Sequence, residues 1–197
     1  MAWKISVLML AMALVASLPQ VECAAEEGKI RMKIEFLKID VPGGQIYSGA
    51  CCDLLVAKRC DCALCFGKYR HCDMQLQLCA ETGEAGSEAS PPKECRGVQV
   101  DTGVLKHNAD SFEFEQGTYG EMSNPFEPVL KKNDELRLKF TLVDWDSVTE
   151  NDLIHRFTKS YPLGELTTGV TTTQTVKAHR GGASTVTITY KLTKYIV

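Results

Sequence analysis

Residues 135–142 read ELRLKFTL. Apolar side chains at the even positions alternate with charged or polar ones at the odd positions, which is the period of a β-strand with one face in a core. The same period recurs in residues 30–36 (IRMKIEF) and 186–192 (VTITYKL). Three such segments in one chain favour an all-β fold built from packed sheets.

Weaker signals complete this prediction. Shorter candidate strands, rich in β-branched and aromatic residues, cover residues 98–100, 112–114 and 171–177. Gly181-Gly182 predicts the turn of the last hairpin, and only residues 73–79 carry a weak helical period. The polar, proline-bearing segment 81–93 is expected to be a surface loop. Together these features predict an antiparallel β-sandwich.

Basic residues occupy positions on the outward side of the predicted strands. They are Arg31, Lys33, Arg137, Lys139 and Lys191. We expect these side chains to be solvated, as lysines on a sheet usually are. A face of this kind could also meet phospholipid headgroups.

The N-terminus has the pattern of a secretory signal peptide. A basic start is followed by an apolar run over residues 5–18, and small residues precede a cleavage point after Cys23. This predicts a signal peptide over residues 1–23 and one secreted, extracellular domain over 24–197. The alternative is a short membrane anchor, although the run is too short to span a bilayer.

Charge and motif content narrow the functional classes. The formal net charge is −3, which gives no reason to expect a nucleic-acid partner. The four histidines are scattered and form no metalloprotease or nucleophile motif. We therefore expect a protein that is not an enzyme.

Eight cysteines remain after the predicted cleavage, all within one stretch of the N-terminal half. They are Cys51, Cys52, Cys60, Cys62, Cys65, Cys72, Cys79 and Cys95. An even number in a secreted chain predicts a disulfide framework, with a zinc cluster as the alternative. The pairing is open, except that the adjacent Cys51 and Cys52 should bridge to different partners because neighbouring side chains in an extended chain point to opposite faces.

Several motifs in order resemble the N-terminal module of the Notch ligands Delta, Serrate and Jagged. They are the opening strand and turn in residues 30–44, GACCD at 49–53, CDMQLQLC at 72–79, Cys95, NPF at 124–126 and the strand 136–145. The resemblance covers nearly the whole predicted mature chain. It implies a C2-like β-sandwich with a disulfide-stapled N-terminal half.

The same resemblance sets expectations for partners. In the ligands, a cysteine-rich Delta-Serrate-Lag (DSL) segment, EGF repeats and a transmembrane helix follow the module, and we expect none of these in this chain. The implied partners are the EGF repeats of a Notch-type receptor and phospholipid headgroups. The alternative is a structural protein of the extracellular matrix, or a secreted scaffold, with no role in Notch signalling.

One acidic stretch resembles a calcium loop of C2 domains. Asp144, Asp146 and Asp152 have the spacing D-x-D-x5-D, and Asp40 ends the strand expected opposite them. Carboxylate oxygens suit calcium, which takes six to eight oxygen ligands. Calcium is therefore the candidate cofactor, and the alternative is a solvated acidic turn. Trp145, inside this stretch, is expected to be a core residue rather than a membrane-inserting tip.

Overall fold

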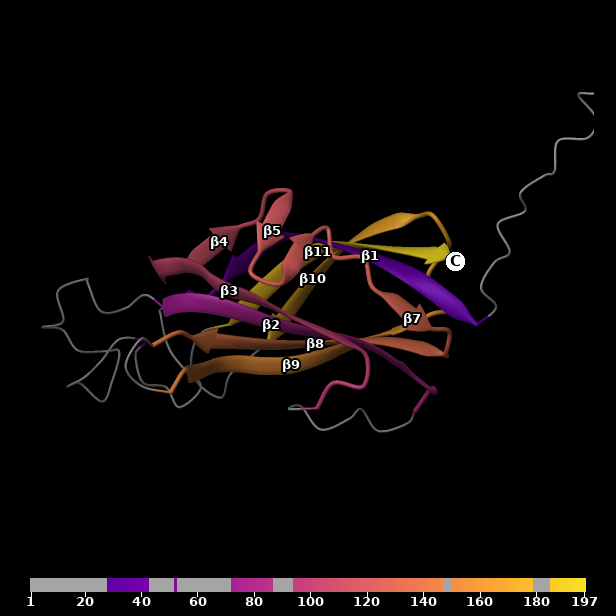
Figure 1. Ribbon diagram of the computed structural model, residues 1–197, viewed down its shortest axis with the longest axis horizontal. Helices are drawn as coiled ribbons and strands as arrows, with labels where there is room; N and C mark the ends of the chain where they lie inside the picture. Colours follow the sequence, from indigo (N-terminus) through magenta and orange to yellow (C-terminus); the bar gives the residue numbers. More distant parts are fainter. Residues whose placement is uncertain (1–27, 43–51, 53–71, 87–93, 147–149, 179–184) are drawn as a thin grey trace, which may run out of the picture.

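A computed structural model describes residues 28–42, 52, 72–86, 94–146, 150–178 and 185–197. Every regular element in these ranges is a β-strand. Within them, no helix is long and apolar enough to cross a membrane. Figure 1 shows the strands as two layers, with β1, β10 and β11 in one and β2, β8 and β9 in the other. The predicted all-β, antiparallel sandwich is confirmed.

The first sheet is built around β1, whose neighbours on either side come from distant parts of the chain. Its strand order is β10-β11-β1-β4, and β7 also pairs with β1. The bounds are β1 Lys29–Asp40, β4 Ser111–Glu113, β7 Val129–Lys131, β10 Thr171–Ala178 and β11 Val186–Ile196. All of these pairings are antiparallel.

The second sheet has the order β3-β2-β8-β9 and is also antiparallel. Its bounds are β2 Cys72–Gly83, β3 Val98–Ala109, β8 Glu135–Asp144 and β9 Asp152–Pro162. A small two-stranded sheet, β5 Gly117–Tyr119 and β6 Met122–Asn124, follows β4 in the chain. The strand β3 leads directly into β4, so the chain crosses from the second sheet to the first at residue 110.

The core lies between the two sheets and is centred on aromatic rings. The ring of Phe36 on β1 lies 6.4 Å from that of Phe140 on β8 and 5.8 Å from that of Tyr190 on β11. All three side chains are fully buried. The hydroxyl groups of Tyr190 and Tyr161 on β9 are 2.5 Å apart, so one hydrogen bond joins the two sheets. Burial of both phenols raises their pKa, because the charged form would lose its hydration.

The NPF motif completes the outer edge of β1. Its Asn124 side chain accepts a hydrogen bond from the backbone N–H of Phe36 at 2.8 Å and donates to the Phe36 carbonyl at 3.0 Å. The same amide donates to the carbonyl of Glu115 at 2.9 Å. The buried Asn124 therefore acts as a strand partner in the gap that β4 and β7 leave along β1, since an amide side chain offers the same donor and acceptor as a peptide.

The strongly alternating segments are strands, as predicted, and residues 171–177 fall within β10. The helical interpretation of residues 73–79 is wrong, because the segment lies in β2 with Met74, Leu76 and Leu78 buried in the core. The predicted loop also starts too early, since β2 continues to Gly83 and Glu81 is buried. Gly181-Gly182 lies outside the described residues.

Candidate functional site

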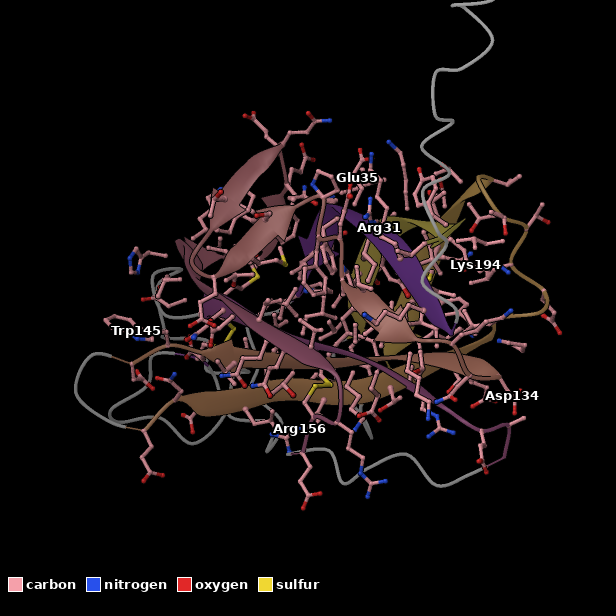
Figure 2. The ribbon with its side chains drawn as sticks, turned by 45° about the vertical axis from the view of Figure 1, so that its right-hand side comes forward. Arg31, Glu35, Asp134, Trp145, Arg156 and Lys194 are labelled. Atoms are coloured by element: carbon pink, nitrogen blue, oxygen red, sulfur yellow. A yellow bond between two sulfur atoms is a disulfide. The ribbon has the colours of Figure 1, made fainter. Side chains whose placement is uncertain are left out.

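Four predicted calcium ligands lie at one end of the sandwich. Strand register shows this directly, because Asp144 at the end of β8 pairs with Asp152 at the start of β9 and with Met74 near the start of β2. On the other sheet, Asp40 ends β1 and pairs with Ser111, one residue after the chain crosses between the sheets. We call this the acidic end, and Trp145 marks it in Figure 2.

Asp144 has a structural position. Its side chain is fully buried, and its Oδ1 accepts a hydrogen bond from the backbone N–H of Asp73 at 2.6 Å. A carboxylate oxygen also lies within 4.8 Å of the sulfur atoms of Cys52 and Cys72. Those two cysteines form a disulfide, so they offer no thiolate to a metal. Asp144 therefore ties the start of β2 to the end of β8.

The other predicted ligands lie in more open surroundings. Asp40 forms an ion pair with Lys38 at 2.9 Å, and this hydrogen bond raises the pKa of the Lys38 ammonium group. The backbone N–H of Asp146 donates to the side chain of Asn151 at 3.2 Å. Asp152 is exposed at the start of β9.

Within the described ranges, no three of the four predicted aspartates bring ligand oxygens within 4.8 Å of one another. Residues 147–149, in the middle of the loop, lie outside those ranges. Calcium binding therefore stays a prediction.

His107, one of the four scattered histidines, also lies at the acidic end. His107 Nδ1 lies 2.7 Å from Asp73 Oδ2, and the imidazole ring packs edge-on against Trp145 with ring centroids 6.2 Å apart. The backbone N–H of Trp145 donates to the Asp73 carbonyl at 2.8 Å. Trp145 is half-buried at this end rather than in the core. Asp73 and Trp145 are 34 or more positions away from His107, and only the tertiary fold brings them together. No spacing in the sequence could therefore have indicated these contacts.

The structure contains two disulfides among the cysteines it describes. Cys52 bridges to Cys72, and Cys79 bridges to Cys95. This confirms the staple interpretation over zinc for these four residues. The four other cysteines predicted to form disulfides lie outside the described residues: Cys51, Cys60, Cys62 and Cys65.

The second disulfide holds a segment over the outer face of the second sheet. Beneath it, Lys139 Nζ lies 2.8 Å from Glu81 Oε1, with both side chains only 3% exposed. Lys139 also donates to the carbonyl of Glu94, and Glu81 accepts from the backbone N–H of Arg96. The expectation that Lys139 is solvated is therefore wrong, because the segment next to Cys95 covers this face.

Arg137 also differs from the expectation. Its side chain is 5% exposed, lies against Gly83 and donates to the carbonyl of Glu84 at 2.9 Å. A Cβ at Gly83 would lie 2.6 Å from the guanidinium, so the glycine makes room for it. On the first sheet, by contrast, Arg31 is exposed and Lys191 is only partly covered, as predicted.

Solved structures show which fold this is. A Drosophila structure described as C2-DSL-EGF1 superposes with a TM-score of 0.53 at 16% identity, over 84% of this chain and 67% of that one. A human GIVD cytosolic phospholipase A2 superposes with a TM-score of 0.51 at 14% identity, over 86% of this chain. The matched part is 17% of the human protein. No protein-family profile and no curated protein sequence matches the chain. The likeness establishes a C2-like fold.

Proposed function

We propose that this protein is a secreted binding module that contacts a Notch-type receptor, a phospholipid surface or both, and that it has no catalytic activity. The observation that carries the proposal is the likeness of this sandwich to the Drosophila C2-DSL-EGF1 structure. That structure has the domain order of the Notch ligands whose motifs this sequence resembles. The superposition on part of a human phospholipase A2 supports the proposed contact with a phospholipid surface.

Two further observations support an extracellular role. The disulfides Cys52–Cys72 and Cys79–Cys95 belong in an oxidising compartment. The cleavable leader predicted over residues 1–23 agrees with that compartment.

The acidic end is the proposed contact surface. Asp146 and Asp152 would supply calcium ligands, with Asp40 opposite them. Asp144 is better placed to hold the fold, because its buried carboxylate binds the backbone of β2. A bound cation would relieve repulsion among the carboxylates and could bridge to lipid phosphate.

The test combines thermal melts with two binding assays. At calcium about a hundredfold above its dissociation constant, the gain is roughly 2.7 kcal/mol, which raises the melting temperature by about 5–10 °C in a domain of this size. Asp146→Asn with Asp152→Asn should abolish this shift, whereas the matched control Asp134→Asn, on the loop before β8, should keep it. Identical melts of the wild type in calcium and in chelator would remove calcium from the proposal.

Binding is measured by flotation with vesicles containing phosphatidylserine, with and without calcium, and by capture on immobilised receptor EGF repeats. Binding in either assay supports the proposal. Absence of binding in both, with a folded protein, would favour a structural role in the extracellular matrix instead.

A further inference from the structure

A cavity of about 540 Å³ lies at the end of the sandwich opposite the acidic end. It is formed by the start of β1, the turn between β7 and β8, the segment after β9 and the end of β11. Figure 2 places Lys194 and Asp134, which both line it, at the end of the molecule away from Trp145. The proposed contact surface and this cavity are therefore separate.

Hydrogen bonds hold the walls of the cavity together. The N–H of Lys132 donates to the carbonyl of Gly28 at 2.7 Å, which ties the turn to the start of β1. The N–H of Leu163 donates to the carbonyl of Asp134, also at 2.7 Å. Lys194 Nζ donates to the Leu163 carbonyl at 2.6 Å. A ligand would meet a preformed site, which lowers the entropy cost of binding.

Large apolar side chains form part of the cavity lining. Ile30 and Leu163 lie in the floor and are 3% and 5% exposed. Ile196, the strand partner of Ile30, is 70% exposed at the mouth. Exposure of a large apolar side chain to water costs free energy. A ligand in the cavity that covered this side chain would recover part of that cost.

The other strongly exposed apolar residues of the described chain gather at the same end. Val129 and Tyr195 flank Arg31 on either side of β1, and Val170 follows Gly169, whose N–H donates to the Lys194 carbonyl. None of these three residues lines the cavity, and Val129 and Tyr195 share the outward face of Arg31.

The charges around the cavity favour an anion. Lys29, Lys132 and Lys194 line it, with Asp134 and Glu135 as the acidic members. Glu135 is paired with Arg137, Nη2 to Oε2 at 3.2 Å, so its charge is compensated. The rim is thus positive in a chain whose formal net charge is −3.

We propose that this cavity binds a single-chain lipid with an anionic head, of the fatty-acid class. The acyl chain lies over Ile30, Leu163 and Ile196, and the carboxylate faces the lysines. The volume is within the range of ligand pockets, about 300–1,000 Å³, and suits one chain rather than two. The proposal does not depend on the function proposed for the acidic end.

The test uses the fluorescent fatty acid 11-(dansylamino)undecanoic acid, below its micellar concentration, with the secreted protein. Its emission should rise and shift to the blue on binding. Lauric acid should displace it at concentrations about fivefold or more below those needed for 1-dodecanol, because the alcohol has the same chain without the charge.

Two variants locate the site. Ile196→Asn should weaken probe binding about tenfold or more, since it removes most of an apolar contact. Lys132→Gln should weaken it about three- to fivefold. Val129→Asn and Lys177→Gln are matched controls outside the cavity lining, and they should bind like the wild type.

Three results would overturn the proposal. The first is no change in probe emission, and the second is unaltered binding in Ile196→Asn. The third is a protein that dimerises in solution, or floats with phosphatidylglycerol vesicles, through Ile196 without binding the probe. That outcome would assign the apolar end to a second copy or to a bilayer.

Discussion

Replacing Lys139 with methionine should lower the free energy of unfolding by about 3–5 kcal/mol, because it removes the ammonium group that pairs with the buried Glu81 carboxylate. Both side chains are 3% exposed, and their Nζ and Oε1 atoms are 2.8 Å apart. Methionine keeps the length of the lysine stem, so packing changes little. The lost bond from Nζ to the Glu94 carbonyl at 2.9 Å adds to the cost.

The magnitude translates into a clear shift in melting temperature. In a domain of 150–250 residues, each kcal/mol moves the midpoint by about 2–4 °C, so a fall of roughly 10 °C is expected. The double variant Lys139→Met with Glu81→Leu should be more stable than Lys139→Met alone, because neither position then carries a buried charge. The coupling energy from the complete cycle should exceed about 2 kcal/mol.

The assay is urea unfolding followed by tryptophan fluorescence under non-reducing conditions, so that Cys79–Cys95 stays closed. A matched control is the pair Lys191–Glu35, with a similar contact of 2.9 Å but side chains 38% and 22% exposed. Lys191→Met should cost less than about 1 kcal/mol. If Lys139→Met costs no more than Lys191→Met, the outer face of the second sheet is open to water and the reasoning about its cover is wrong.

Three other perturbations test other parts of the fold. Asn124→Ala should cost about 3 kcal/mol in urea unfolding, since it removes three hydrogen bonds at the edge of β1; a cost below about 1 kcal/mol would contradict its role as a strand partner. Gly97→Ala should lower the melting temperature by several degrees, because its Cβ would lie 2.0 Å from a backbone oxygen of β2, whereas Gly164→Ala meets nothing within 4 Å and should melt nearly like the wild type. Burial raises the pKa of Tyr161 and Tyr190 above the ordinary value of about 10, so their contribution to stability is complete below that pH and declines as pH rises beyond it. Tyrosinate absorbance of the two phenols should therefore appear only together with unfolding. Their titration near pH 10 in a folded protein would refute their burial.

Local pattern was sufficient where apolar and polar residues alternate along a strand, even in β8, whose outer face is also covered. Residues 30–36, 135–142 and 186–192 alternate strictly, and all three are long central strands. The strand β9 was missed because it is an edge strand paired with β8 across a register shift between Leu142 and Val143. That irregularity breaks the period, and the exposed residues 158–160 carry no apolar signal.

The candidate site, like the fold, could be predicted from the sequence only in part. Spacing along the chain indicated Asp144, Asp146 and Asp152, because they are close in sequence, whereas Asp40 came from the resemblance to C2 domains and the disulfides from the even number of cysteines. It could not distinguish the buried Asp144 from the exposed Asp152, since burial depends on which strand and which disulfide lie alongside. The contact between His107 and Asp73 likewise joins residues from two strands.

The sequence by itself determined the class of this protein: disulfide-bonded, all-β and assembled from antiparallel strands. Only the tertiary structure decided which charged side chains are buried. Lys139 occupies an outward strand position like that of Lys191, yet it is covered because Cys95 brings a distant segment over it. Alternation reports the two faces of one strand, whereas burial on the outer face depends on chain that packs there from elsewhere.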